Sequence, residues 1–219
     1  MSRPHEKPVT PPPYWREACR ELADRDPVIA RLIGEHPGEA VRGSGDPFRT
    51  MLNAIVGQQI SVAAADGIWA RLLEAFPRFT PRTIAAAEPA RLREVGLSAR
   101  KAEYAVGAAT AFSDGRVDPG RWPGMSDDEI RSELTALRGV GPWTADMMLI
   151  FSAHRPDVLP LGDIGLLNAA ARLYGWNGAA PTAAKRRERL REHAEAWRPW
   201  RTVGTWYVWC DLDEDTVIY

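Results

Sequence analysis

Proline and glycine divide this chain into segments of helical length, and their placement constrains the fold more than any other feature. A helix start is indicated at Asp46-Pro47, at Glu88-Pro89 and at Gly141-Pro142. Proline suits the first position of a helix, where its missing N–H costs nothing, and aspartate caps the exposed amides. After Asp46-Pro47, apolar side chains recur at helical spacing through residues 48–56. The punctuation therefore predicts a chain of short helices.

Capping residues and apolar spacing extend this pattern along the chain. Ser61, Ser98 and Thr182 are placed to cap helices, and Ser126 with Glu129 fits a capping box. Strand alternation is nowhere sustained, so we expect an all-α fold. The predicted helices cover about 14–34, 47–57, 62–76, 89–96, 99–112, 127–137, 142–151, 164–173, 183–197 and 200–209.

The charge balance gives little support for a nucleic-acid partner at first sight. The 219 residues hold 28 basic and 29 acidic side chains, a net charge of −1. Only residues 42–125 carry a basic excess, eleven against eight. Arginine greatly outnumbers lysine, and its planar guanidinium binds two phosphate oxygens at once. Genome composition can produce the same excess of arginine. Any electrostatic footprint is modest, and we expect a log-log salt slope of about −2 to −4.

Cysteine content and hydropathy exclude several classes of protein. Cys19 and Cys210 are too few for a four-thiolate metal site or a disulfide framework, which favours a reducing compartment. No apolar run reaches the length of a membrane helix. Five prolines lie within the first fifteen residues, which lack the apolar stretch of a secretory signal, and we expect a mobile Pro-rich arm over residues 1–13.

The most informative local segment covers residues 137–145 and holds two glycines one residue apart. Such a pair permits a turn so tight that backbone amides point outward at the start of the next helix, where they can bind an anion. A phosphate could be held there without net positive charge. A C-cap glycine followed by an ordinary corner between two helices explains the same letters. The residues of this candidate phosphate-binding hairpin are Arg138, Gly139, Val140, Gly141 and Thr144.

Asp163 lies twenty-two residues after Gly141, beyond one helix and a loop with two prolines. Taken alone, it is a plain helix N-cap. The amide dipoles at a helix N-terminus favour a charged carboxylate, so we expect Asp163 to be kept ionised.

Four blocks of sequence, taken in order, resemble the helix-hairpin-helix base-excision DNA glycosylases. These blocks are residues 55–64, 96–101, the hairpin with the loop that leads to Asp163, and 197–201. They look like the corresponding stretches of the 3-methyladenine DNA glycosylase II subfamily, and the resemblance covers roughly residues 42 to 210. Larger members carry an N-terminal mixed α/β domain, which we do not expect here.

The resemblance implies a two-lobed helix-hairpin-helix glycosylase fold with the active-site cleft between the lobes. One lobe would cover 42–150 and hold the hairpin. The other would combine 14–41 with 151–219 and carry Asp163. The implied function is monofunctional hydrolysis of the N-glycosidic bond of alkylated purines, such as 3-methyladenine and 7-methylguanine, after base flipping. Asp163 would stabilise the oxocarbenium-like transition state or activate water.

The implied partner is double-stranded DNA with damaged bases. A flipped purine needs an aromatic or apolar pocket, and its candidate walls are Trp143, Met147, Ile164, Trp206 and Trp209. Gln58 and Gln59 lie where the family inserts a side chain, as a wedge, into the gap left by the flipped base. The alternative is that both glutamines cap exposed helix ends. The remaining expected core tryptophans are Trp69, Trp122, Trp176 and Trp197.

Two other functions stay open. A bifunctional glycosylase and abasic-site lyase needs an amine nucleophile, and the family's lysine position just after the hairpin holds Trp143 here. A non-catalytic binder of DNA structure would keep the hairpin alone. We expect no cofactor and no iron-sulfur cluster, because only Cys210 lies near the C-terminus. We also expect no metal held by side chains, although hairpin carbonyl oxygens are a candidate place for a monovalent cation.

We expect a monomer without membrane association, in the cytoplasm and with the nucleoid in a bacterium. The charged run at 185–195 is typical of a solvated helix with internal ion pairs. A lone loop histidine without metal partners, His154, is given no role.

Overall fold

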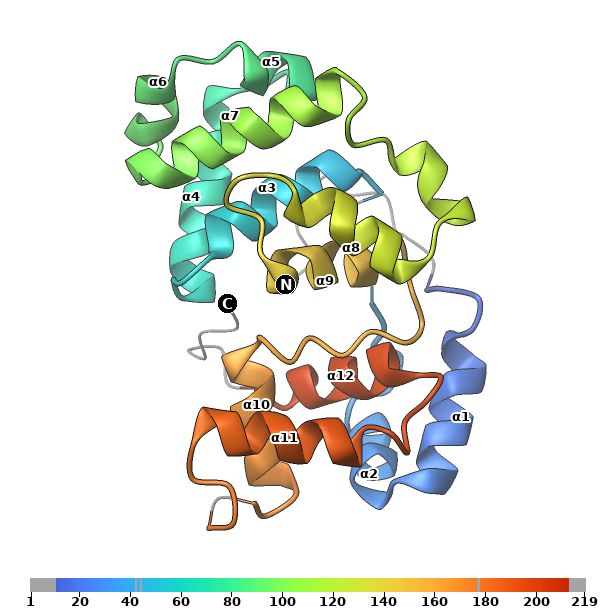
Figure 1. Cartoon of the computed structure of the whole chain (residues 1–219). Helices are drawn as coiled ribbons and strands as arrows, with labels where there is room; N and C mark the ends of the chain where they lie inside the picture. Colours follow the sequence, from blue (N-terminus) through green and yellow to red (C-terminus); the bar gives the residue numbers. More distant parts are fainter. Residues whose placement is uncertain (1–10, 42, 44, 177, 213–219) are drawn as a thin grey trace.

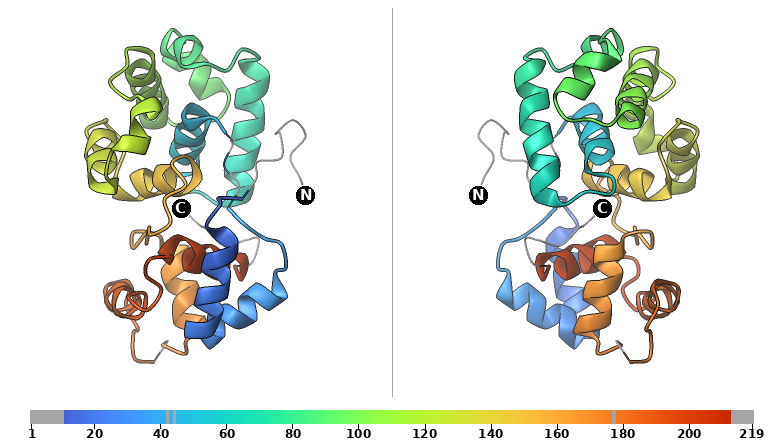
Figure 2. Two further views of the ribbon diagram at one scale, coloured as in Figure 1. Left: turned by 90° about the vertical axis from the view of Figure 1, so that its right-hand side faces the viewer. Right: turned by 90° about the vertical axis from the view of Figure 1, so that its left-hand side faces the viewer.

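The computed structural model describes residues 11–41, 43, 45–176 and 178–212, and every regular element within them is a helix. The predicted all-α fold is confirmed, and the helices form two groups (Figures 1 and 2). The hairpin lobe contains α3 (Pro47–Gly57), α4 (Val62–Ala75), α5 (Pro81–Ala85), α6 (Pro89–Glu94), α7 (Ala99–Ser113), the 3₁₀ turn η1 (Pro119–Gly124), α8 (Asp127–Thr135) and α9 (Pro142–Phe151). The terminal lobe contains α1 (Trp15–Arg25), α2 (Pro27–Glu35), α10 (Ile164–Leu173), α11 (Ala183–His193) and α12 (Arg201–Cys210). Helix pairs with extensive contact, such as α3 with α9 and α10 with α12, lie within one lobe.

The capping signals work as the sequence predicts. The Asp46 carboxylate accepts hydrogen bonds from the amides of Phe48 and Arg49 at the start of α3. Ser126 and Glu129 form the reciprocal capping box of α8. These local bonds satisfy amides that have no partner within the helix, which explains why the helix starts can be found from sequence.

Other boundaries differ from the prediction. The single helix expected near 14–34 is two helices, because Pro27 opens α2 and the Asp26 carboxylate caps the amides of Val28 and Ile29. This is the same Asp-Pro signal that marks α3. Helix α11 ends at His193 rather than at Trp197, and α5 and η1 are additional short elements.

Each lobe has its own apolar interior. In the hairpin lobe the rings of Phe48 and Phe79 lie 5.6 Å apart, and Trp69 packs edge-on against Phe79. In the terminal lobe the fully buried Trp197 packs beneath α12, where it occupies the space that a side chain at Gly204 would need. The four tryptophans predicted to lie in the core, Trp69, Trp122, Trp176 and Trp197, are all buried.

The terminal lobe also contains a buried carboxylate. The Oδ2 of Asp26 accepts hydrogen bonds from the Tyr174 hydroxyl (2.7 Å) and the Trp197 indole (2.8 Å), and it lies 3.0 Å from His193 Nε2. Burial alone would raise the pKa of Asp26, but these hydrogen bonds outweigh it and hold the pKa far below its usual range. Asp26 therefore joins α2 to α10 and α11.

A segment over residues 152–163 crosses from the hairpin lobe to the terminal lobe (Figures 1 and 2). At its start, the Arg155 guanidinium donates to the carbonyls of Trp122 and Met125. The Thr202 hydroxyl, from α12, donates to the carbonyl of Arg155. The crossing is thus attached to both lobes before it delivers Asp163 to α10.

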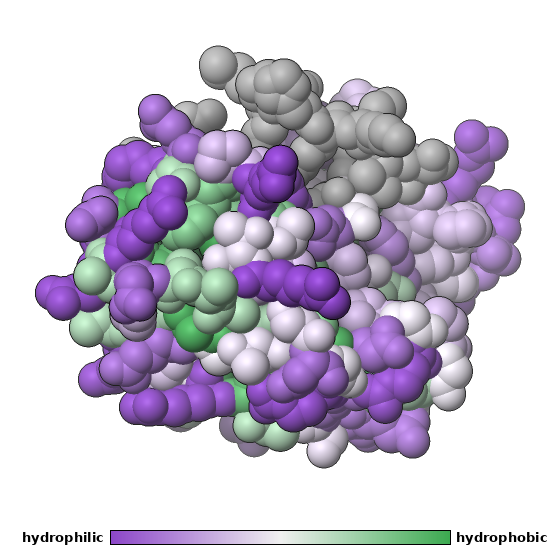
Figure 3. Space-filling view, turned by 90° about the horizontal axis from the view of Figure 1, so that it is seen from above, coloured by the Kyte–Doolittle hydropathy of each residue, from purple (hydrophilic) through white to green (hydrophobic). Residues whose placement is uncertain are grey.

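The outer face of the hairpin lobe faces solvent. Seen from above, hydrophilic side chains alternate on it with small apolar areas (Figure 3). Within the described ranges, no helix is long and apolar enough to cross a membrane. Of the Pro-rich arm expected over 1–13, only residues 11–13 are described, and Pro12 accepts a backbone hydrogen bond from Trp15.

Candidate active site

Asp163 lies at the N-terminus of α10, as predicted, and its side chain is only 1% exposed. Its Oδ1 accepts a hydrogen bond of 2.7 Å from the Leu166 amide. Its Oδ2 accepts one of 2.9 Å from the Trp143 indole, which belongs to α9 in the other lobe. Both carboxylate oxygens are therefore fixed, one by each lobe.

Burial and the helix N-terminus have opposite effects on the pKa of Asp163. Burial raises its pKa from 3.8 to about 6, although hydrogen bonds from the Leu166 amide and the Trp143 indole lower it. The nearby Trp209 indole lowers it as well, although this N–H is buried without a hydrogen-bond partner of good geometry. The amides at the helix N-terminus favour the charged form, as expected, but the loss of water outweighs them. With a pKa of about 6, the carboxylate is charged at neutral pH.

The loop before Asp163 is anchored by side chains from α11 and α12. The Arg201 guanidinium binds the Asp157 carboxylate through Nε (2.6 Å) and Nη2 (2.9 Å). Arg187 Nε donates to the Leu161 carbonyl at 2.9 Å, two residues before Asp163. The expectation that the charged run of α11 is merely solvated is corrected for Arg187, because a side chain of this run holds the loop that carries the carboxylate.

Aromatic rings from α9 and α12 lie beside one another near this site. The Phe151 ring stacks on Trp209 at 6.0 Å and meets Trp206 edge-on at 6.4 Å. The indole N–H groups of Trp206 and Trp209 are buried and unpaired among the described residues. Phe151 was not predicted, and its apolar place in α9 gave no signal that it differs from core residues.

The other predicted pocket walls have unlike surroundings. Met147 is buried within α9, among the core residues of the hairpin lobe. Ile164, the residue after Asp163, is 47% exposed and is the one large hydrophobic side chain of the described ranges that lies largely in solvent. The structure therefore brings Trp143 and Trp209 to Asp163 and leaves Ile164 on the surface beside it.

The hairpin has the tight turn that its glycines predict. Gly139 has a φ of +87°, and a Cβ there would overlap the Tyr104 ring of α7. Gly141 is the N-cap of α9 and supplies no side chain to the amides of the first turn. Those amides can accept an anion, as expected of a helix N-terminus.

The predicted side chains of the hairpin differ in their exposure. The Arg138 side chain is 80% exposed and pairs with Glu103 at 3.3 Å. Val140 is buried, so only its backbone belongs to the turn surface. Thr144 is buried as well, and its hydroxyl accepts a hydrogen bond from Gln58. Thr144 can therefore belong to the predicted phosphate site through its backbone amide, in the first turn of α9, and not through its hydroxyl.

The two glutamines between α3 and α4 also differ. The Gln58 amide donates to the Gly139 carbonyl (3.0 Å) and to Thr144 Oγ1 (3.1 Å). Because its side chain is engaged by the hairpin, Gln58 does not fit the predicted wedge role. Gln59 is exposed, and its φ of +59° lies in the left-handed region, which is uncommon for a residue other than glycine.

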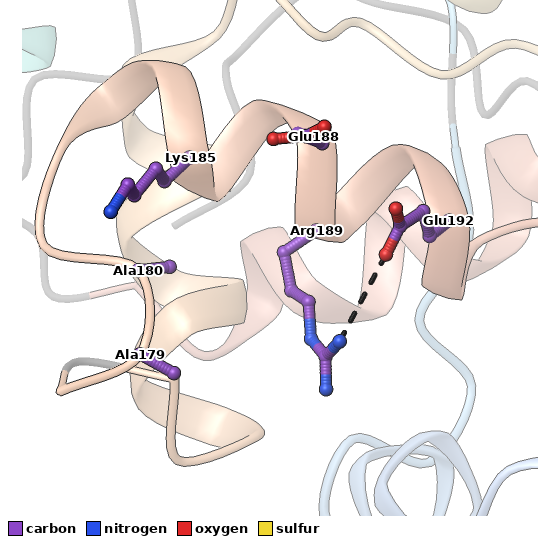
Figure 4. Close-up of a pocket in the computed structure, with 6 residues that line it drawn as sticks. All are labelled: Ala179, Ala180, Lys185, Glu188, Arg189 and Glu192. Atoms are coloured by element: carbon purple, nitrogen blue, oxygen red, sulfur yellow. Dashed lines mark ion pairs between the residues drawn. The ribbon is translucent and has the colours of Figure 1, made fainter.

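A separate cavity of about 320 Å³ lies on α11 and the loop before it (Figure 4). It is lined by Ala179, Ala180, Lys185, Glu188, Arg189 and Glu192. Its charged side chains include the ion pair of Arg189 with Glu192, and none of the predicted site residues lines it. In the part of the chain that is described, no three His, Cys, Asp or Glu side chains are grouped so that they could hold a metal ion.

Comparison with known proteins places this geometry among DNA repair proteins. Residues 52–198 match the HhH-GPD superfamily base excision DNA repair protein family. DNA-3-methyladenine glycosylase 1 of Schizosaccharomyces pombe is 29% identical over 187 residues, which cover 83% of this chain and 79% of that protein. DNA-3-methyladenine glycosylase of Bacillus subtilis is 27% identical over 201 residues, 86% of this chain and 65% of that protein.

A solved DNA glycosylase structure is similar to this chain over most of the length of both proteins. The Schizosaccharomyces pombe 3-methyladenine DNA glycosylase, in complex with abasic DNA, superposes with a TM-score of 0.78 at 27% identity. The match covers 91% of this chain and 99% of that one.

Proposed function

Because the chain belongs to the HhH-GPD superfamily of base excision DNA repair proteins, we propose that it is a monofunctional DNA glycosylase that removes alkylated purines from double-stranded DNA. The predicted resemblance to this superfamily is confirmed. The observation that carries the proposal is the Asp163 carboxylate, buried and held between the Leu166 amide and the Trp143 indole. The names of the relatives support 3-methyladenine as one substrate.

Asp163 supplies the negative charge that the reaction needs. Cleavage of an N-glycosidic bond builds positive charge on the sugar as the base departs. A carboxylate about 4 Å away, at an effective dielectric constant of about 20, attracts that charge by about 4 kcal/mol. This is roughly a thousandfold in rate. Asp163 is buried, and the loss of water raises its pKa to about 6. Because the carboxylate is poorly solvated, it gains most when a cation forms beside it. It also serves as a base for the attacking water.

Indole rings favour a cationic base. Purines alkylated at N3 or N7 carry positive charge, which weakens their glycosidic bond. Such a base gains about 0.5–2 kcal/mol from the face of an indole when both are shielded from water. Trp143 and Trp209, whose indole N–H groups lie next to Asp163, would provide these faces, and Trp206 lies on the same helix as Trp209.

The hairpin binds the DNA backbone, and Gln59 enters the duplex where the flipped base has left it. The amides of the first turn of α9, after the N-cap Gly141, bind a phosphate of the strand. The exposed side chain of Gln59 fills the space that the flipped base leaves. Arg138 adds a cation at the turn once its exposed pair with Glu103 opens.

The test uses a duplex with a single 7-methylguanine, under conditions of excess protein. Wild-type protein releases the base, and Asp163→Asn lowers the single-turnover rate by about a thousandfold, the factor worked out above. Binding of Asp163→Asn to a duplex with an abasic-site analogue persists, because the hairpin is unchanged. The matched control is Asp118→Asn at η1, another N-cap aspartate, whose exposed side chain lies outside the site.

Two results would replace this proposal with another function. Trapping of a covalent protein–DNA adduct by borohydride would indicate a lyase with an amine nucleophile. Tight binding to the abasic duplex without release of any base from wild-type protein would indicate a binder of DNA structure.

A further inference from the structure

Gln58 fixes the orientation of a peptide group in the hairpin. Its amide donates to the Gly139 carbonyl at 3.0 Å, and the amide N–H of the same peptide group, that of Val140, donates to the Leu137 carbonyl at 3.1 Å. A planar peptide group that is bonded at both ends cannot rotate. The second hydrogen bond of Gln58, to Thr144 Oγ1, reaches the first turn of α9. One side chain thus connects the end of α3 with both halves of the hairpin.

Lys101, in α7, also binds the end of α3. Its Nζ donates to the Val56 carbonyl at 2.8 Å. This carbonyl belongs to the last turn of α3, where carbonyls have no partner within the helix. Burial lowers the pKa of Lys101, in keeping with an ammonium group partly withdrawn from water. The same helix, α7, contributes the Tyr104 ring against Gly139.

Gln59 directly follows these two attachments, at Val56 and Gln58, in the chain. Its backbone is in the left-handed region at φ +59°, and its side chain is exposed. An unfavourable backbone conformation persists only where the surroundings impose it. Here the residues on either side are fixed, since Gln58 is bonded to the hairpin and the Ile60 amide donates to the Gly57 carbonyl at 3.4 Å.

We propose that Gln58 and Lys101 are positioning residues, which hold Gln59 at a fixed place relative to the phosphate-binding hairpin. When a DNA strand is bound at the hairpin, the space left by its flipped base then lies next to Gln59. The inference rests on the proposed function, in which Gln59 fills the gap. It assigns Gln58 a role in DNA recognition without contact between its side chain and the DNA.

The experiment is a double-mutant cycle on the preference for damaged DNA. The measured quantity is the ratio of affinities for a duplex with a tetrahydrofuran abasic-site analogue and for the same duplex intact. Gln58→Met keeps the length of the side chain and removes the amide, and Lys101→Met removes the ammonium group. Each is made in the wild-type background and in a Gln59→Ala background. Thermal melting of every variant without DNA separates loss of folding from loss of recognition.

Each single variant is expected to lower this ratio about fivefold to tenfold, the effect of losing one or two hydrogen bonds that hold a contact in place. In the Gln59→Ala background the same changes have no further effect, because the side chain that they position is gone. The matched control is Arg25→Met, which removes a side-chain bond to the Arg198 carbonyl in the terminal lobe and leaves the ratio unchanged.

The inference is overturned if Gln58→Met leaves the ratio unchanged, or if its effect is equally large with and without the Gln59 side chain. The second result would mean that Gln58 merely supports the hairpin. Failure of the proposed function is a separate result, since it is measured as the absence of 7-methylguanine release by wild-type protein, whereas the cycle needs binding alone.

Discussion

Replacing Asp163 with asparagine is expected to stabilise the folded protein above pH 7 while it slows base release about a thousandfold. The reason is that the folded protein holds this carboxylate at 1% exposure, where its charge is poorly solvated. Asparagine has the same shape and no charge. A group arranged for catalysis at a cost in stability is a common feature of active sites.

The magnitude follows from the pKa. Folding raises the pKa of Asp163 from 3.8 to about 6, and each pKa unit corresponds to 1.36 kcal/mol. Because the folded pKa is the higher one, Asp163 contributes stability below about pH 4, and this contribution is lost as the pH rises towards 6. The wild-type protein therefore loses about 3 kcal/mol relative to Asp163→Asn between pH 4 and pH 8.

The loss of one hydrogen bond offsets part of the stability that Asp163→Asn gains at high pH. The asparagine oxygen can keep the Leu166 amide, but its NH₂ group cannot accept from the Trp143 indole, and the lost bond costs about 1 kcal/mol. Asp163→Asn should be about 1 kcal/mol less stable than wild type near pH 4 and about 2 kcal/mol more stable at pH 8. For a chain of this size the latter is a rise in Tm of roughly 4–8 °C.

The assay is urea unfolding followed by tryptophan fluorescence, at four values between pH 4 and pH 8. Asp118→Asn serves as the control, because it makes the same change at an exposed N-cap aspartate outside the site. A difference between Asp163→Asn and wild type that does not change with pH would contradict this prediction, and so would a lower stability of Asp163→Asn at pH 8.

The single-turnover rate of base release should rise with pH up to about 6 and then level off as Asp163 ionises; a rate that stays constant from pH 5 to 8 would contradict this. Asp26→Asn should lower the free energy of unfolding at pH 7 by about 3 kcal/mol, because a buried acceptor of several hydrogen bonds is replaced. Since the pKa of Asp26 is depressed on folding, this loss should shrink as the pH falls below about 4, and equal stability of the two proteins at pH 7 would count against it. Gly139→Ala should weaken DNA binding about tenfold, because its φ of +87° and the Tyr104 ring exclude a Cβ; unchanged binding would show that the turn is not the phosphate site. Arg187→Met should slow base release about tenfold without a change in DNA affinity, since it frees the loop before Asp163; a loss of affinity with an unchanged rate would oppose that assignment.

Local chemistry explains what could be predicted from the sequence. Asp46, Ser126 and Asp163 cap helices through bonds to amides two or three residues away, and such bonds depend on little beyond the neighbouring sequence. The break at Asp26-Pro27 carries the same local signal. The apolar spacing continues across it, and this spacing favours one longer helix.

The charge state and surroundings of the site were not predictable in this way. The pKa of Asp163 depends on its burial and on the hydrogen bond from Trp143, which lies twenty residues earlier and in the other lobe. The bond from Gln58 to the hairpin joins residues 81 positions apart. In both cases the sequence places the right residue in the site, and long-range packing decides which atoms it touches.

In the proposed function this protein excises alkylated purines by means of Asp163. The most direct measurement incubates wild-type protein and Asp163→Asn with methylated genomic DNA and identifies the released bases by mass spectrometry. We expect 3-methyladenine and 7-methylguanine from the wild type and neither base from Asp163→Asn. Release of neither base by the wild type, or equal release by both proteins, would contradict the claim.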